Sequence, residues 1–277
     1  MEKLWQKLFL PRVEEYQVWE VFHENSKGSQ YHNGPSEQEV IKKMGQLHES
    51  LPFVGYPVVP LPEPIKRLNC PLDQALSFRR SSRSFIPTTI DLAQLSAILY
   101  FTYGVSLDKN KTELFRSYRM SPSAGALYPL EIFFHSTQVR GLNPGIYHYN
   151  PLHHHLRLIK EGDATAEVDS AMVQKDLTNN ALLTIFISAV FERSIFKYGN
   201  RGYRFIFLEA GHVAQNINLV SGALGLGCIN IGGFFDRQID SLLGFDGLTQ
   251  STIYIVATGK IRKHFDNASP NSKGAMQ

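Results

Sequence analysis

The segment from Arg79 to Ser84 carries three arginines and three hydroxyl side chains within six residues. An arginine guanidinium presents a planar fork of donors that matches the oxygens of a phosphate, and its charge persists at any working pH. Each charge-assisted hydrogen bond of this kind contributes on the order of 1.5–3 kcal/mol. Two or three of them converging on one dianion would hold a phosphorylated ligand. The segment therefore indicates a phosphate site, and the alternative is a basic turn exposed to solvent.

Two further stretches suit close contact with a flat ligand. Residues 121–129 read Ser-Pro-Ser-Ala-Gly-Ala-Leu-Tyr-Pro, so prolines stiffen a loop of mostly small side chains. With so little side-chain bulk, the backbone of this loop can lie against a planar ring. Gly232 and Gly233 offer a second close backbone approach. The alternative for residues 121–129 is an ordinary tight loop.

Composition describes a globular protein and argues against several classes of function. The chain has 277 residues, 43% of them hydrophobic, and a net charge of +3, which is too small to indicate nucleic-acid binding. Residues 1–10 contain no long apolar run, so we expect a cytoplasmic protein with no membrane span. Cys70 and Cys228 form no CxxC pattern, and three consecutive histidines on a strand point to opposite faces, so no metal site is predicted.

The elements that must position these residues are a mixture of helices and strands. Capping residues and apolar periodicity predict helices at 36–49, 72–78, 91–103, 163–178 and 204–224, and strands at 131–135, 145–149, 156–159, 181–191 and 251–258. The continuous apolar run at 181–191 is typical of a strand buried on both faces. The helix at 204–224 is apolar nearly all round, which places it in the centre of the fold or in an oligomer interface.

Prolines separate an N-terminal extension from the main domain. Five prolines among residues 52–64 require an extended chain that takes no interior position in a sheet. We interpret this stretch as an arm that lies on a surface, either of its own subunit or of a partner. We therefore expect an extension with a proline-rich arm over residues 1–70, a cofactor-binding domain over 71–263 and a polar tail over 264–277.

Taken together, these stretches resemble the nitroreductase superfamily of flavin enzymes and, within it, the SagB-type dehydrogenases. The matching segments come in the family's order and are residues 79–85, 121–131, 209–216 (Glu-Ala-Gly-His-Val-Ala-Gln-Asn), 225–227 and 232–234. The resemblance covers about residues 70–262. It implies an α+β fold, a three-layer sandwich with a mostly antiparallel central sheet, assembled as an intertwined homodimer. It also implies FMN as the cofactor, bound at the dimer interface and touched by both subunits.

The resemblance assigns roles to residues that the chemistry has already singled out. One subunit would hold the FMN phosphate and ribityl chain with Arg79, Arg80, Ser81 and Arg83, and would place Lys260 near the phosphate. The other subunit would pack Pro122, Ser123, Ala124 and Gly125 on the flavin ring. Gly232 and Gly233 would lie near the reactive edge of the ring. Many nitroreductases have Asn at the position of Ala126, and this departure favours the SagB-type branch.

A Lys-Tyr pair is associated with proton removal in the azoline-oxidising members of that branch, and Lys197-Tyr198 resembles it. A lysine amine, with a reference pKa of about 10.4, acts as a base near neutrality only where its surroundings lower its pKa by about 3 units. Arg193, Arg201 and Arg204 are near in sequence and could supply positive charge. We predict Lys197 as the base and Tyr198 as the residue that orients the substrate. The alternative is a polar loop after the buried strand.

The function implied by the resemblance is an FMN-dependent oxidoreductase that dehydrogenates azoline rings, thiazolines or oxazolines, in a peptide natural-product pathway. Its partners would be a second copy of the chain, a peptide or small-molecule substrate and cyclodehydratase proteins, with no nucleic acid and no membrane. One alternative is an NAD(P)H-dependent reductase of nitro compounds or quinones. Another is a flavin-binding scaffold subunit of a biosynthetic complex.

Overall fold

A seven-stranded antiparallel sheet forms the centre of the computed structural model, which describes residues 17–28, 34–112 and 116–262. The strand order is β1-β8-β7-β5-β9-β11-β10, and every neighbouring pair is antiparallel. The strands are β1 Val58–Pro60, β5 Leu130–Ser136, β7 Gly145–Asn150, β8 His155–Glu161, β9 Leu183–Val190, β10 Gly227–Ile231 and β11 Gln250–Gly259. The mostly antiparallel central sheet that the resemblance implies is therefore confirmed.

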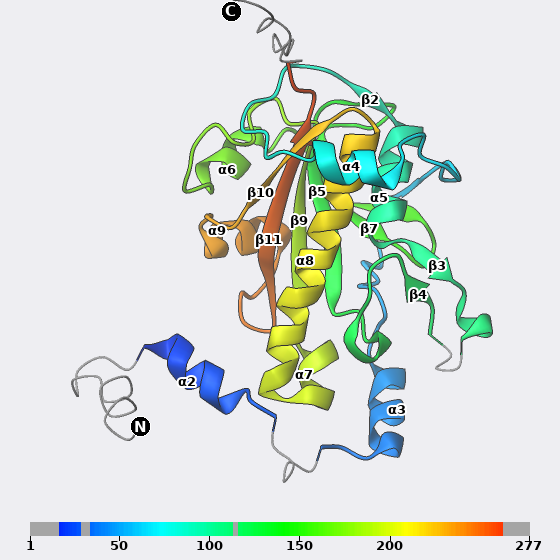
Figure 1. The fold of residues 1–277 in the computed structure, drawn as a ribbon, viewed down its shortest axis with the longest axis vertical. Helices are drawn as coiled ribbons and strands as arrows, with labels where there is room; N and C mark the ends of the chain where they lie inside the picture. Colours follow the sequence, from blue (N-terminus) through cyan, green and yellow to red (C-terminus); the bar gives the residue numbers. More distant parts are fainter. Residues whose placement is uncertain (1–16, 29–33, 113–115, 263–277) are drawn as a thin grey trace, which may run out of the picture.

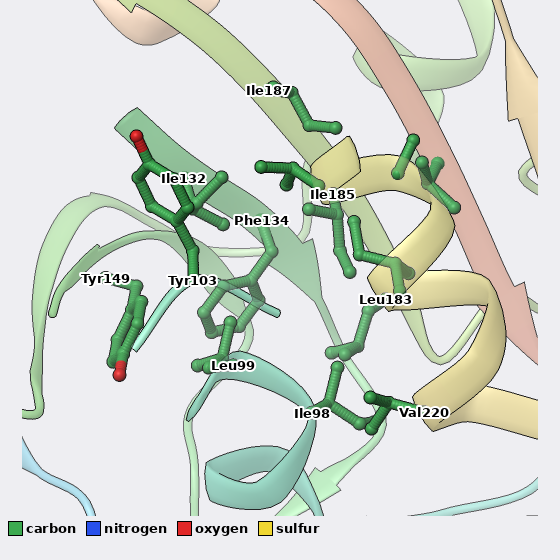
Figure 2. Packing of buried hydrophobic residues seen from close by; sticks show 14 of the residues in the cluster. Ile98, Leu99, Tyr103, Ile132, Phe134, Tyr149, Leu183, Ile185, Ile187 and Val220 are labelled. Atoms are coloured by element: carbon green, nitrogen blue, oxygen red, sulfur yellow. The ribbon is translucent and has the colours of Figure 1, made fainter. Parts of the chain in front are cut away.

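Helices cover both faces of this sheet, so the fold has three layers (Figure 1). Helices α5 (Leu92–Tyr103) and α8 (Asn200–Ala223) lie on one face, and α6 (Thr165–Ser170) and α9 (Asp236–Leu243) lie on the other. Successive residues of β5 enter different cores, because side chains alternate along a strand. Phe134 lies near Leu99 of α5, in the same core as Val220 of α8, which lies beside Ile98 in Figure 2, whereas Phe133 packs in the opposite core.

Local sequence signals fix several helix ends. Helix α5 begins after Asp91, whose side chain accepts from the backbone N–H of Gln94 in a capping box. Helix α3 (Glu37–Gln46) begins with the same motif at Ser36. Helix α4 spans Leu72–Phe78, the bounds that the sequence predicts.

The helix predicted over 163–178 is wrong beyond its first turns. Helix α6 ends at Ser170, and the chain then folds back because the Asp169 carboxylate accepts from the backbone N–H of Asp176 and from the Thr178 hydroxyl. Such local side-chain bonds compete with helix formation. The elements that were not predicted include α7 (Glu192–Tyr198), α9 and β10.

The proline-rich arm contributes the edge strand β1, which pairs with β8 at Val59 and Leu156. An edge position agrees with the expectation that prolines exclude this stretch from the sheet interior. Ahead of the arm, α2 (Val18–Asn25) and α3 lie beside α7 and the start of α8 (Figure 1). The short strands are β2 Ile90–Asp91, β3 Val105–Leu107, β4 Tyr118–Arg119 and β6 Val139–Arg140. The predicted tail 264–277 lies outside the described residues, and the domain boundary at residue 70 stays a prediction.

Candidate active site

A pocket of about 690 Å³ gathers the residues predicted to hold a phosphate. Its lining includes five cationic side chains and no carboxylate; the cations are Arg79, Arg80, Arg83, Lys260 and Arg262. Ser81, Ser82 and Ser84 line it too, so cations and hydroxyl donors surround the space. This combination suits a dianionic phosphate and disfavours a cation. Two segments about 180 residues apart in the sequence, 79–84 and 260–262, are thereby brought together.

Backbone pairing brings these two segments together. The Ser82 N–H donates to the carbonyl of Cys228 in β10 over 2.7 Å, and the Ile86 N–H donates to the carbonyl of Lys260 over 2.8 Å. Gly227 permits this approach, because a Cβ atom there would lie 2.6 Å from the Ser82 hydroxyl oxygen. The arginine segment therefore extends the edge of the sheet, with its cations at one end of β10.

The predicted flavin-edge glycines lie at the other end of the same strand. Gly232 and Gly233 directly follow β10 and are exposed, and a Cβ atom on Gly232 would meet no atom within 4 Å. Five residues of strand separate Gly227 from Gly232, which corresponds to about 17 Å. Between them, the side-chain oxygen of Asn230 accepts from the Asn218 amide over 2.8 Å. A phosphate at one end of β10 and a ring at the other would thus share one surface.

The small-residue loop is an ordered, left-handed turn. Gly125, Ala126 and Tyr128 have positive φ angles of 63°, 51° and 48°. The Ser123 hydroxyl oxygen accepts from the backbone N–H of Tyr128 over 2.9 Å and closes the turn. Residues other than glycine persist in this conformation only where the surroundings impose it.

Lys197 and Tyr198 lie on α7 and reach this turn, so they do not form the loop considered as the alternative from the sequence. A Cβ atom on Gly125 would lie 2.6 Å from the Tyr198 Oη and 3.0 Å from the Lys197 Nζ. The Lys197 Nζ also lies 5.2 Å from the centre of the Tyr198 ring. The structure therefore joins two predictions, the Lys-Tyr pair and the small-residue loop, in one place.

The arginines expected to assist Lys197 are engaged elsewhere. Arg193 points into the interior and pairs with Glu131. Arg204 donates to the Ser26 hydroxyl and the His23 carbonyl at the end of α2, and Arg201 donates to the Ser26 carbonyl. These two arginines fasten the N-terminal helix to α8.

A buried ionic cluster, which the sequence analysis missed, holds α7 in place. The Glu131 carboxylate, 1% exposed, lies 2.6 Å from the Arg193 Nη2 and 2.6 Å from the His148 Nε2, and it accepts from the Leu51 N–H over 2.7 Å. Burial by itself would raise the pKa of this carboxyl, but Arg193 and His148 outweigh burial and lower the pKa to about 2. A carboxylate inside an apolar strand is the signal that could have revealed this cluster, because a buried charge needs partners.

Helix α8 separates the two halves of the candidate site. Gly222, near its end, lines the phosphate pocket, whereas Lys197 and Tyr198 immediately precede its first turn. Twenty-two residues of helix correspond to about 33 Å, and Figure 1 shows α4 and α7 at opposite ends of α8. The arginine-lined pocket and the Lys-Tyr pair of one chain therefore lie at opposite ends of α8.

A second cavity, of about 1000 Å³, lies on the opposite side of α7. Its lining is largely apolar and includes Phe22, Phe191, Ile195, Tyr203 and Phe207. This lining does not suit a phosphate.

In the described ranges no group of three or more His, Cys, Asp or Glu side chains could hold a metal ion. Nor does any helix in those ranges combine the length and apolarity needed to cross a membrane.

Several known proteins are similar to this chain in sequence or fold. The nitroreductase family model matches residues 76–260. MJ1384 of Methanocaldococcus jannaschii, assigned as a nitroreductase, is 36% identical over 172 residues, which cover 62% of this chain and 83% of that protein. The microcin B17-processing protein McbC of Escherichia coli is 28% identical over 152 residues, or 52% of this chain and 54% of McbC. A crystal structure from Anabaena variabilis, assigned as a nitroreductase, matches 92% of this chain and 49% of that one, with 27% identity and a TM-score of 0.68. The chain thus spans about half the length of McbC and of the Anabaena chain.

Proposed function

Since this chain belongs to the nitroreductase family of FMN-dependent oxidoreductases, and to its SagB-type branch, we propose that it dehydrogenates azoline rings in a peptide natural-product pathway. The contact of Lys197 and Tyr198 with the turn at Gly125 carries this proposal. This contact places a potential base, the Lys197 amine, beside the loop at residues 122–125, which by resemblance would pack on the flavin. The name of McbC, a processing protein for microcin B17, supports a peptide substrate.

The residues of the phosphate pocket fit FMN. Arg79, Arg80, Arg83 and Lys260 would bind its phosphate, with Ser81 donating to the phosphate or the ribityl chain. Gly232 and Gly233 would leave room for the ring at the far end of β10. FMN, when bound, supplies the acceptor for the hydride that an azoline loses as it becomes aromatic.

In the proposed reaction, the side chains of this chain handle the proton. A thiazoline or oxazoline loses one hydride and one proton when it becomes a thiazole or oxazole. The Lys197 amine would take that proton from a ring carbon, and Tyr198 would hold the ring in the orientation that exposes it. The turn at Gly125 leaves both side chains room to reach the ring, because glycine has no Cβ atom.

A homodimer would complete the site. Pairing two copies in opposite directions along α8 would bring the Lys-Tyr end of one chain to the arginine end of the other. Exposed apolar side chains on α4 and α8 support such an interface: Leu72 is 67% exposed, Phe78 74% and Leu208 61%. Sedimentation equilibrium tests this arrangement, and a monomer at the concentration that supports full turnover would exclude it.

The absorbance spectrum of the purified protein, recorded anaerobically, tests the function. We expect bound oxidised FMN that NADPH leaves oxidised and that an azoline peptide reduces. Lys197→Ala should keep the flavin spectrum and slow this reduction by at least about 10²-fold, the usual contribution of a general base. Lys160→Ala, which removes a surface ion pair with Glu167, is the control and should reduce the flavin at the wild-type rate. Azoline oxidation that survives Lys197→Ala would refute the assignment.

The similarity to MJ1384 favours a second candidate, an NAD(P)H-dependent reductase of nitro compounds or quinones. Rapid bleaching of the flavin by NADPH would favour this reductase function.

A cyclodehydratase partner is a further part of the proposal, because azolines must be formed before they can be oxidised. If a complex with such a partner kept full activity after the replacement of both Lys197 and Tyr198, the chain would be a scaffold subunit.

A further inference from the structure

Two asparagines join helix α8 to the edge strand β10. Asn218, on α8, is 5% exposed, and its Nδ2 donates to the Ala214 carbonyl over 2.7 Å and to the Asn230 Oδ1 over 2.8 Å. Asn218 also lines the phosphate pocket, whereas Asn230 is exposed and the other four residues of β10 are buried. The pair therefore lies where the pocket meets the surface that leads along β10 to Gly232.

Asn230 lies on the same face of the sheet as the phosphate pocket. Side chains alternate along a strand, so residues 228 and 230 face one way, and Ile229 and Ile231 face the other. Ile229 and Ile231 pack in the core with α9, whereas Cys228 packs in the core with α8 and also lines the pocket. A ligand that begins in the pocket and follows β10 to Gly232 would thus pass over the Asn230 side chain.

The hydrogen bonds determine which way both amides point. The Ala214 carbonyl can only accept, so the Asn218 atom beside it is the nitrogen, which has two hydrogens to donate. The second hydrogen goes to Asn230, whose facing atom must be its oxygen, because an amide NH₂ group does not accept hydrogen bonds. The Asn230 NH₂ group is therefore turned away from Asn218, and no group in the described ranges accepts from it.

We infer that Asn230 binds the ribityl chain of FMN, and that Asn218 is a positioning residue that keeps the Asn230 NH₂ group turned toward this chain. Asn230 stands three residues after Gly227, which lines the phosphate pocket, and two before Gly232, so about 10 Å and 7 Å of strand separate it from them. The ribityl chain is the part of FMN between the phosphate and the ring, and its hydroxyl oxygens can accept from an NH₂ group. The inference rests on the placement of FMN in the proposed function, but not on azoline oxidation.

Fluorescence titration of the flavin-free protein with FMN and with riboflavin tests the inference. We expect Asn230→Ala to weaken the binding of both by about tenfold, because riboflavin carries the same ribityl chain without a phosphate. Asn218→Ala should weaken both by the same factor or less, and the double variant should bind no worse than Asn230→Ala. Asn179→Ala, which removes an exposed asparagine that pairs with Asp176, is the control and should bind both flavins like the wild type.

The bound flavin itself distinguishes a ribityl contact from a ring contact. At saturating FMN, Asn230→Ala should keep the absorption spectrum and the reduction potential of the wild-type complex, because hydrogen bonds to the ring tune its electronics and hydrogen bonds to the ribityl chain do not. A changed potential would place the contact on the ring and overturn the assignment. A loss of affinity for FMN alone would place the contact on the phosphate and overturn it too.

Unchanged affinity for both flavins in a folded Asn230→Ala protein would also contradict the inference. Additive losses in the double variant would remove the positioning role of Asn218, because they would mean that it does not act through Asn230. These results are separate from the reaction. If Asn230→Ala behaves as expected while azoline peptides fail to reduce the flavin of the wild-type protein, the inference stands and the proposed function fails.

Discussion

Replacing Glu131 by Gln should destabilise the protein far more than the loss of one surface ion pair. The carboxylate has two oxygens and accepts from Arg193, His148, the Leu51 N–H and the Ser50 hydroxyl. An amide would offer one oxygen and would turn an NH₂ group toward a donor. Breaking a buried ion pair from one side costs about 3–5 kcal/mol, because the charge that remains, here Arg193 at 2% exposed, stays buried without its partner.

That cost is about a fifth or more of the free energy of unfolding of a typical protein, which is about 5–15 kcal/mol. For a chain of this length, each kcal/mol shifts the melting temperature by about 2–4 °C. We therefore expect a shift of roughly 6–20 °C, together with a lower urea midpoint at an unchanged m-value. Urea unfolding followed by tryptophan and tyrosine fluorescence measures both quantities.

Glu192→Gln is a matched control on the same helix, α7. Glu192 pairs with Lys43 on the surface, where it is 52% exposed, and such pairs contribute about 0–1 kcal/mol. If Glu131→Gln cost no more than Glu192→Gln, the buried cluster would not be holding α7. A partial recovery in Glu131→Gln combined with Arg193→Met would support the reasoning, because it removes the unpaired charge.

Three further predictions concern the site. Gly125→Ala places a Cβ atom 2.6 Å from the Tyr198 hydroxyl at a φ of 63°, so azoline turnover should fall by about 10²-fold. The control is Gly45→Ala, whose added Cβ atom would meet no atom within 4 Å, and it should leave turnover unchanged. Lys260→Met should weaken FMN binding by about tenfold or more and leave riboflavin binding unchanged, since riboflavin has no phosphate; equal losses for both ligands in fluorescence titration would contradict a phosphate role. In the folded state the pKa of Glu209 is raised to about 7, so between pH 4.5 and 7 the folded protein should bind more protons at Glu209 than the unfolded chain does. The stabilising contribution of this group is therefore lost as pH rises through 7. In urea unfolding at several pH values, Glu209→Gln should remove a decline of about 3 kcal/mol across that range, and an identical pH profile for both proteins would refute it.

Elements with local signals could be predicted from the sequence. The capping box at Asp91 and the apolar run at 181–191 act within a few residues of the chain, and both α5 and β9 form where those signals stand. That Arg79, Arg80 and Arg83 line one pocket could also be expected from their closeness in the sequence, whereas their role in binding a phosphate stays a prediction. Lys260 was assigned to the same pocket only by the family resemblance, because no local sequence signal connects residue 260 with residue 79.

Helix α7 and strand β10 carried no such signal. Helix α7 is seven residues long, too short to display a clear apolar period, and its N-cap residue, Phe191, provides no side-chain cap. Its position depends on Arg193 and Glu131, which are 62 residues apart in the sequence. Long-range pairing of this kind is invisible in a single sequence, although each partner is visible as a charge in an apolar neighbourhood.

Glu131 and Glu209 show how one buried region can hold two carboxyl groups with opposite pKa shifts. Glu131 meets Arg193 and His148 directly, so its charged form is stabilised and its pKa lies at about 2. Glu209 accepts from the Tyr103 hydroxyl, and the charge of Arg119 reaches it without a direct ion pair, so burial prevails and its pKa rises to about 7. The first group therefore anchors α7 as a permanent charge over the physiological range. The second accepts from the Tyr103 hydroxyl, which joins α8 to α5, and it changes charge within that same range.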